Sequence, residues 1–236
     1  TVGQQVTGLN AQAPFLGGEL VAMAAPIAKG AWEVTRVEDL AAALETAIAT
    51  AMRPPCGPVV LSLPLDVLAA PATAVRHGTH PAVAEPAPPD VRTAARLLAE
   101  ANTPAVLIGD GVAHADAGDL VVDLAERIGA PIYGEPFAAR QAIPSRHLLW
   151  RGQLPGFAAE IAPRLEHHDV LVAIGMPVFR LFGDSPGPAL PSGVRLVHLD
   201  VDAYEVGRTI TPTVGLVGPI DESLVELLRL LPSPVS

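Results

Sequence analysis

The sequence has few cysteines, few lysines and no long apolar run. Its one cysteine, Cys56, excludes an intramolecular disulfide and any metal site made of several cysteines. Lys29 is the only lysine, acidic residues outnumber basic ones by 25 to 15, and no basic run follows any segment, so nucleic acid is not an expected partner. Proline, glycine or aspartate breaks every apolar run well short of the roughly 18 residues that a membrane span needs. These absences predict a cytoplasmic protein with no membrane partner.

The residues that are present indicate a folded protein. Hydrophobic residues make up 50% of the 236 residues and charged residues 17%, which excludes intrinsic disorder and leaves length for one or two domains. The chain starts at Thr1 without a methionine or a signal-peptide pattern. Residues 1–5, TVGQQ, are typical of a strand end and the turn after it, so we expect the chain to be part of a longer polypeptide.

The first third of the chain predicts a small α/β arrangement. Residues 6–34 indicate a loop, a short helix and a return segment. Thr35 and Glu38 form a capping-box pattern ahead of a helix, whose apolar residues recur at helical spacing from Val37 to Met52. Residues 59–63 are an apolar run typical of a strand covered on both faces. We assign residues 1–70 to this part and the proline-rich residues 71–89 to a linker.

From residue 90 onward, strands alternate with helices. Strands are predicted at 105–108, 131–133, 170–174, 194–199 and 214–217, with a long loop at 134–152. Helices are expected after the caps Asp90, Asp116 and Asp221, with a left-handed cap at Gly129, and over 155–166, where Pro163 predicts a kink or a restart. The alternation predicts a doubly wound parallel sheet of the Rossmann-like kind over residues 90–236.

Gly109-Asp110-Gly111 follows a predicted strand and suggests two kinds of site. A dinucleotide fingerprint needs a third glycine where His114 stands. A magnesium–diphosphate motif needs a later asparagine, but the only asparagines, Asn10 and Asn102, come before it. We therefore favour a tight turn from strand to helix.

Other polar motifs also have structural explanations. Residues 183–187 match the G-x-S-x-G pattern around Ser185, but the prolines that follow exclude the helix that a nucleophile elbow requires. Asp200 and Asp202 follow a strand, where they could bind a ribose hydroxyl or a metal, although capping of residues 203–206 by Asp202 is favoured.

The histidines show no metal-ligand spacing. His167 and His168 are expected at a solvated helix end, where a cation complements the helix dipole. His77 and His80 lie in the predicted linker. His147 and His198 come near strand ends, without a recognisable partner in the sequence.

Three segments carry a resemblance to a known family: residues 1–29, the run GPVVLSLPLD at 57–66, and residues 151–182 together with HLDVD at 198–202. They resemble thiamine-diphosphate (ThDP) enzymes, and most of all the benzoylformate decarboxylase branch. The resemblance identifies residues 1–70 as the end of a pyrimidine-binding (PYR) domain and residues 90–236 as the central domain of such an enzyme. It implies non-oxidative decarboxylation of a 2-oxo acid to an aldehyde with ThDP and Mg²⁺.

In that family a PYR-domain glutamate activates ThDP, and a third domain holds the diphosphate and Mg²⁺. By the resemblance, the glutamate precedes Thr1 and the third domain follows Ser236. We therefore expect this chain alone to contain no catalytic residue, to bind no ThDP or metal, and to be inactive. The implied partners are a 2-oxo acid, the missing PYR and diphosphate-binding segments, and further subunits of a homodimer or homotetramer.

The resemblance assigns three residues to a substrate pocket: Phe15, Leu16 and Phe182. Phe182 stands where benzoylformate decarboxylases have a catalytic histidine, and a phenyl ring cannot relay a proton. A carboligase or lyase of the acetolactate synthase or benzaldehyde lyase type therefore stays open. So do a nucleotide- or FAD-binding module and a purely structural assembly domain, although the incomplete fingerprint argues against FAD.

Overall fold

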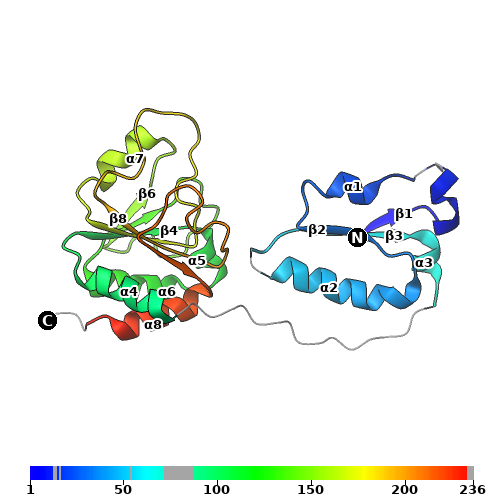
Figure 1. Cartoon of the computed structure of the whole chain (residues 1–236), viewed down its shortest axis with the longest axis horizontal. Coiled ribbons are helices and arrows are strands. Elements are labelled where there is room, and N and C mark those ends of the chain that lie inside the picture. Colours follow the sequence, from blue (N-terminus) through cyan, green and yellow to red (C-terminus); the bar gives the residue numbers. More distant parts are fainter. Residues whose placement is uncertain (13–14, 16, 54, 72–87, 233–236) are drawn as a thin grey trace. The chain divides into compact units, whose positions relative to one another are not determined.

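The computed structural model describes residues 1–12, 15, 17–53, 55–71 and 88–232, so most of the predicted linker lies outside the described residues, as do His77 and His80. The chain forms two compact units, unit 1 (Thr1–Val83) and unit 2 (Ala84–Ser236). Each unit has its own parallel sheet (Figure 1). Among the described residues, no helix is long and apolar enough to cross a membrane.

Unit 1 is built on a parallel sheet of three strands in the order β1 (Val2–Gln4), β3 (Val59–Pro64), β2 (Gly30–Glu33). Helices α1 (Leu20–Ala24) and α2 (Leu40–Met52) lie on opposite faces of this sheet (Figure 1). The shorter elements are η1 (Thr7–Gln12), η2 (Val37–Asp39) and α3 (Leu65–Ala69). The predicted return segment is therefore strand β2, and the strand end at residues 1–5 is confirmed as β1.

The predicted capping box at Thr35 and Glu38 is wrong. The α-helix begins at Leu40 after the 3₁₀ turn η2, and neither helix start has a side-chain cap. Glu38 pairs instead with Arg36, at 3.4 Å between its carboxylate and Nε. The Glu38 carboxylate also accepts its own backbone N–H group. These are not the bonds of a capping box, in which the carboxylate would accept the Thr35 N–H group.

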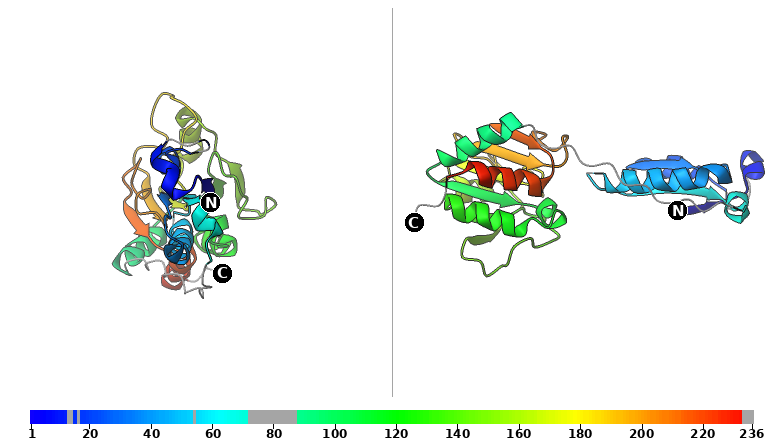
Figure 2. Two further views of the ribbon diagram at one scale, coloured as in Figure 1. Left: turned by 90° about the vertical axis from the view of Figure 1, so that its right-hand side faces the viewer. Right: turned by 90° about the horizontal axis from the view of Figure 1, so that it is seen from below.

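Unit 2 contains a parallel sheet of six strands in the order β6-β5-β4-β7-β8-β9. The strands are β4 (Pro104–Ile108), β5 (Ile132–Gly134), β6 (Trp150–Gln153), β7 (Val170–Ile174), β8 (Arg195–Asp200) and β9 (Val214–Val217). The helices are α4 (Pro88–Ala99), α5 (Asp110–His114), α6 (Gly118–Ile128), α7 (Ala158–Leu165) and α8 (Ile220–Leu230). Helices α4, α6 and α8 cover one face of the sheet, and α7 lies on the other (Figures 1 and 2).

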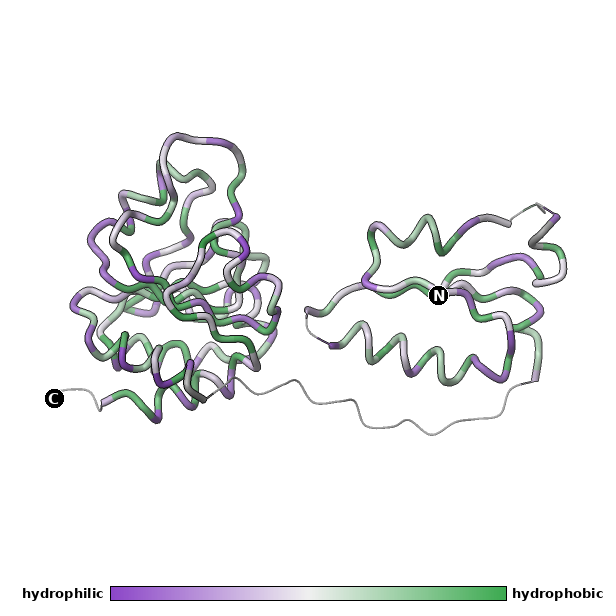
Figure 3. Tube along the Cα trace, viewed as in Figure 1, coloured by the Kyte–Doolittle hydropathy of each residue, from purple (hydrophilic) through white to green (hydrophobic). Residues whose placement is uncertain are grey.

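The central strands are buried on both faces, which explains their unbroken apolar runs. In β7, Leu171 and Ala173 pack in the core beneath α7, whereas Val170, Val172 and Ile174 pack in the core beneath α4, α6 and α8. Successive side chains of a strand point to opposite faces, so a strand covered on both faces needs apolar residues at every position. Figure 3 shows these strands as hydrophobic along their length. The predicted doubly wound sheet is confirmed.

The predicted loop at 134–152 is wrong at its end, where Trp150–Gln153 forms the edge strand β6. Its sequence, WRGQ, has neither an apolar run nor a clear apolar alternation, because an edge strand is only partly covered. The pairing of β6 with β5 also shifts register.

The predicted aspartate caps are corrected in detail. Helices α4 and α8 begin before Asp90 and Asp221, which lie in the first turn. In α6 the N-cap position is Ala117 and not Asp116. First-turn carboxylates still favour a helix through its dipole. Gly129 is confirmed as a left-handed cap, with φ of 67°. Helix α7 is shorter than predicted and runs through Pro163 without a restart, ending two residues later at Leu165.

Candidate functional site

The sheet order of unit 2 reverses between β4 and β7, its two central strands. From β4 the chain proceeds outward through β5 to β6, and from β7 it proceeds through β8 to β9 on the other side. Ligands of open parallel sheets bind outside the carboxyl ends of the strands at this point of reversal. The candidate site is therefore the region that follows Ile108 of β4 and Ile174 of β7.

The turns after β4 and β7 are in direct backbone contact. The Gly111 N–H group donates to the Gly175 carbonyl at 3.0 Å. A Cβ atom on Gly111 would lie 2.6 Å from the Gly175 Cα atom, and one on Gly109 would lie 2.5 Å from the Gly175 oxygen. Gly175 also has a φ of 60°. Only glycines allow the two turns to come this close. Backbone atoms therefore fill the space at the point of reversal.

The amide groups that begin α5 are used within the protein. The Gly109 N–H group donates to the Ile174 carbonyl at 3.1 Å, and that of Asp110 donates to Oε1 of Glu135 at 3.1 Å. Both carboxylate oxygens of Asp110 accept backbone N–H groups, from Ala139 at 3.2 Å and from Arg140 at 2.9 Å. The cavity beside Gly109 measures about 10 Å³, room for at most about one water molecule. The tight-turn interpretation of Gly109–Gly111 is confirmed, and no contact here favours a nucleotide.

Glu135 is the buried acid of this region. Its side chain is nearly inaccessible, at 6% exposure. Burial raises the pKa of the Glu135 carboxyl, and the charges of Asp110 and Asp200 raise it further, while the Asp110 amide bond and Arg180 oppose them. Glu135 is not among the residues that the sequence predicted for a site. The only available signal was its position directly after β5, beside the point of reversal.

Phe182 lies at the carboxyl edge of the sheet in a group of three phenylalanines, called here the aromatic trio. Its ring centroid is 6.2 Å from that of Phe137, which follows β5, and 5.8 Å from that of Phe157, which follows β6. The Phe182 residue is 75% exposed and Phe137 47% exposed. Three separate loops therefore present one accessible aromatic surface. Phe137 and Phe157 were also missed from the sequence, because nothing in it indicates that the loops meet.

The other two predicted pocket residues belong to unit 1 or fall outside the description. Phe15 is 86% exposed, and its carbonyl accepts a hydrogen bond from Nε2 of Gln5 at 3.1 Å. Leu16 lies outside the described residues. The structure thus surrounds Phe182 with other aromatic residues, and it describes Phe15 only within its own unit.

His198, for which the sequence showed no recognisable partner, has two partners in the structure. Its buried ring donates from Nε2 to the Met176 carbonyl at 2.9 Å, while Nδ1 accepts the Gly207 N–H group at 3.5 Å. Burial lowers the pKa of the His198 imidazole, so the neutral ring is favoured. This bond holds the turn after β7 that leads toward Phe182.

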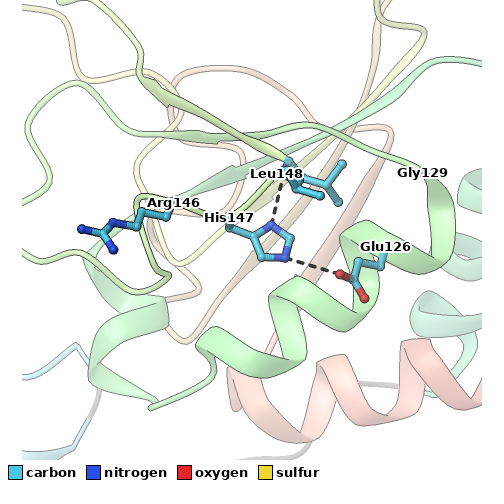
Figure 4. A pocket seen from close by; sticks show the side chains of 6 residues that line it. Glu126, Gly129, Arg146, His147 and Leu148 are labelled. Atoms are coloured by element: carbon cyan, nitrogen blue, oxygen red, sulfur yellow. Dashed lines mark hydrogen bonds and ion pairs between the residues drawn. The ribbon is translucent and has the colours of Figure 1, made fainter.

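His147 also has a partner, in a pocket of about 490 Å³ lined by Glu126, Gly129, Arg146, His147, Leu148 and Leu149. Its Nε2 lies 3.4 Å from the Glu126 carboxylate, and its Nδ1 accepts the Leu149 N–H group at 3.3 Å. Arg146 points away from this pair (Figure 4). The imidazole is thus engaged on both sides and connects the loop before β6 to α6.

The remaining polar motifs have structural roles. The Ser185 hydroxyl accepts the Ala159 N–H group at 3.2 Å and so caps α7 from a distant loop. Asp200 and Asp202 accept N–H groups of Asp202 and Tyr204, both at 2.9 Å, within a turn rather than the predicted helix. Burial raises the pKa of the Asp200 carboxyl.

The two histidines after α7 differ from each other. His167 is solvated, as predicted, whereas the ring of His168 contacts the Thr103 carbonyl at 3.1 Å and the Tyr133 hydroxyl at 3.5 Å. Burial lowers the pKa of the His168 imidazole.

The described residues do not form a magnesium–diphosphate site. No group of three or more histidine, cysteine, aspartate or glutamate side chains among them could hold a metal ion. The carboxylate of Asp110, the acid of the Gly-Asp-Gly segment, is already engaged by two backbone amides. No reaction step is therefore assigned to a metal or diphosphate held by these residues.

Comparisons with protein families and with curated proteins both point to one enzyme family. The family described as "Thiamine pyrophosphate enzyme, central domain" matches residues 91–227. A benzoylformate decarboxylase of Pseudomonas aeruginosa is 36% identical over 97% of this chain and 44% of its own length. An acetolactate synthase of Mycobacterium leprae is 30% identical over 98% of this chain and 37% of its own. The chain thus spans less than half the length of these relatives.

Solved structures agree in fold. The benzoylformate decarboxylase of Polynucleobacter necessarius superposes with a TM-score of 0.91 at 30% identity, covering 98% of this chain and 44% of the other. The 4-hydroxybenzoylformate decarboxylase of Rhodococcus jostii superposes with a TM-score of 0.90 at 31% identity, covering 99% and 45%. The sheet order, the family match and these likenesses together show that the chain belongs to the thiamine-diphosphate-dependent enzyme family and contains its central domain.

Proposed function

We propose that the polypeptide containing this chain is a ThDP-dependent decarboxylase that converts a 2-oxo acid to an aldehyde and carbon dioxide. The observation that carries the proposal is the 36% identity to a benzoylformate decarboxylase across 97% of the chain, against 30% for the acetolactate synthase. Residues 1–70 would be the end of its PYR domain, 71–89 the linker and 90–236 the central domain.

The chain's own part in the reaction is to shape the substrate pocket. Phe182 projects from the carboxyl edge of the sheet, where ligands of such sheets bind, and its exposed ring is free to contact a substrate. Phe15 and Leu16 stay proposed pocket residues of the intact enzyme on the basis of the family resemblance. Because the described residues contain no metal-binding group, we place ThDP and Mg²⁺ on segments outside this chain and expect the 236 residues alone to be inactive.

A carboligase is the second candidate, and Phe182 is the observation that favours it. A phenyl ring cannot donate the proton that releases an aldehyde, so a bound intermediate would survive longer and could meet a second carbonyl compound. The similarity to acetolactate synthases, whose names describe such a condensation, agrees with this candidate.

The test is turnover by the full-length polypeptide, supplied with ThDP, Mg²⁺ and a panel of aromatic and aliphatic 2-oxo acids. Aldehyde as the main product supports the decarboxylase, and a 2-hydroxyketone or a 2-hydroxy-3-oxo acid supports the carboligase. No turnover of any 2-oxo acid would reject both. Phe182→His restores a proton donor and should raise aldehyde release by about 10²-fold if proton transfer limits it. The 236-residue chain, assayed alongside, should show no activity.

The wider setting follows from the same proposal. We expect the intact enzyme to be a cytoplasmic homodimer or homotetramer, with its ThDP between domains of two subunits. Sedimentation of the full-length polypeptide checks the assembly state. A strictly monomeric and fully active enzyme would contradict it.

A further inference from the structure

The aromatic trio brings together three loops that are separate in sequence. Phe137 follows β5, Phe157 precedes α7, and Phe182 lies beyond β7. The Phe157 and Phe182 rings meet edge to face, with 72° between their planes, and the Phe137 and Phe182 rings are tilted by 41°. Both centroid distances lie in the range of interacting aromatic pairs, and the edge-to-face geometry of Phe157 and Phe182 is one that such pairs favour. Phe182 is the ring common to both pairs.

The backbone beneath the trio is adapted to this contact. The Phe182 N–H group donates to the Gly156 carbonyl at 2.8 Å, which ties the Phe182 loop to the loop before α7. A Cβ atom on Gly156 would lie 3.0 Å from Cζ of Phe137 and 3.1 Å from Cβ of Phe182. Gly156 does not have a positive φ. Glycine is therefore favoured at this position because a side chain would have too little space, and not because of the backbone conformation.

The Phe182 ring is held on part of its surface and open on the rest. An apolar side chain that is 75% exposed would ordinarily sample several rotamers, because little packing selects one of them. Here the rings of Phe137 and Phe157 and the hydrogen bond of the Phe182 N–H group limit the number of rotamers. Phe137 and Phe157 thus influence the direction in which the open part of the ring faces.

We propose that Phe137 and Phe157 are positioning residues, which orient the Phe182 ring as a wall of the 2-oxo acid pocket and so set the fit of the substrate. The proposal rests on the proposed function, since it takes Phe182 to be a pocket residue. It assigns no chemistry to either ring. Loss of one neighbour should loosen the Phe182 ring and weaken substrate binding, and leave the chemical step nearly unchanged.

The first experiment measures ring packing without activity. The 236-residue chain labelled with 4-fluorophenylalanine has five phenylalanines and so five fluorine resonances, and Phe182→Leu identifies that of residue 182. Phe137→Ala and Phe157→Ala should each move the Phe182 resonance, whereas Val225→Ala, an exposed position on α8, should not. An unmoved Phe182 resonance in both alanine variants would overturn the proposal.

The second experiment measures function in the full-length polypeptide. Phe137→Ala and Phe157→Ala should each raise KM for the 2-oxo acid about two- to tenfold, the worth of an aromatic pair, with kcat within about twofold of wild type. Phe137→Tyr and Phe157→Tyr keep the ring and should restore the wild-type KM. A general loss of folding would instead lower Tm and activity together.

The two failures can be told apart. If wild type turns over a 2-oxo acid and Phe182→Ala changes KM, but neither neighbour does, the positioning role is rejected and the proposed function stands. If wild type turns over no 2-oxo acid, the proposed function is rejected, and with it the effect on substrate fit. The fluorine experiment still decides whether the neighbours hold the ring.

Discussion

The two units have the same kind of α/β arrangement, but they differ in how completely their apolar residues are buried. In unit 2 every residue of β4 and β7 is buried, and helices or loops cover both faces of the sheet. In unit 1 the 13-residue helix α2 has no buried residue, although it is apolar on nearly all sides. Its Leu40, Ala43 and Ala47 pack on the small core around Leu61, while other apolar side chains of α2, namely Leu44, Ile48 and Met52, remain exposed.

This difference shows that the same local pattern does not give the same degree of burial. A sheet of three strands with incompletely buried helices buries a smaller share of its apolar surface than a sheet of six strands, and small folding units are correspondingly marginal. We expect unit 2 to unfold as an independent domain and unit 1 to be the less stable of the two. The two tryptophans, Trp32 in unit 1 and Trp150 in unit 2, allow each unit to be followed separately by fluorescence.

The largest effect is expected from Gly175→Ala in unit 2. Gly175 and Gly129 have similar left-handed φ angles, 60° and 67°, but a Cβ atom at 175 would lie 2.7 Å from the Gly111 Cα atom, and one at 129 would meet nothing within 4 Å. Gly129→Ala should therefore cost only the conformational strain of about 1–2 kcal/mol. Gly175→Ala should destabilise unit 2 by more than about 4 kcal/mol. Urea unfolding followed by Trp150 fluorescence compares the two, and equal losses would contradict the close backbone contact.

The pH dependence of unit 2 should change in Glu135→Gln. A carboxyl whose pKa is raised in the fold contributes stability below its unfolded pKa, and this contribution is lost as pH rises through the folded pKa. The glutamine variant keeps an oxygen for the Asp110 amide but does not ionise. It should match wild type near pH 4 and unfold at a higher temperature near pH 8.

The control for Glu135 is Glu100→Gln, at an exposed position just after α4, and this variant should leave Tm unchanged. His198 has the opposite sign. Because its pKa is lowered by burial, its contribution is complete above the ordinary histidine pKa of about 6.5 and is lost as pH falls below it. A Glu135→Gln variant whose gain in Tm did not grow with pH would show that the carboxyl is not buried as described.

A smaller effect is expected from Ser185→Ala, which removes the hydroxyl that caps α7. Loss of such a cap typically costs about 1 kcal/mol. Ser192→Ala, in the exposed loop before β8, serves as the matched control and should be neutral. Chemical denaturation of the two variants measures the difference, and an unchanged midpoint for Ser185→Ala would argue against the cap.

The smallest effect is expected on the exposed side of α2 in unit 1. Ile48→Glu should change the unfolding free energy by less than about 0.5 kcal/mol, because the side chain is already 41% exposed. Ala47→Glu, one residue away but packed on the core, should cost about 2 kcal/mol or more. Trp32 fluorescence reports both. Equal costs would mean that the exposed side of α2 is buried in solution.

The sequence predicted most of the fold because buried strands and helices need apolar residues in regular patterns along the chain. The strands of unit 2 were identified from apolar runs, and α2 from the spacing of its apolar residues. The misses occurred where this periodicity is absent: β6 is a short, partly covered edge strand, and Thr35 and Glu38 match a capping pattern but form no cap, while Glu38 pairs with Arg36. Local motifs do not report such competing partners.

Less of the candidate site was predictable. The reading of Gly109–Gly111 as a tight turn was confirmed, and the segment 151–182 belongs to the family match. The roles assigned to Phe15, Leu16 and Phe182 stay predictions. The partners of His147 and His198 and the positions of Glu135, Phe137 and Phe157 could not be inferred, since each depends on loops that are far apart along the chain.

The sequence by itself determined the fold class of unit 2 and the family resemblance, because the apolar period of each segment and the family motifs are local properties. Only the tertiary structure decided what happens at the carboxyl edge of the sheet. There the glycines at 109, 111 and 175 close the point of reversal, Glu135 takes the amide of Asp110, and the Phe182 ring meets two others. The physical reason is that these contacts join the ends of different strands, and parallel pairing, not sequence proximity, places those ends together.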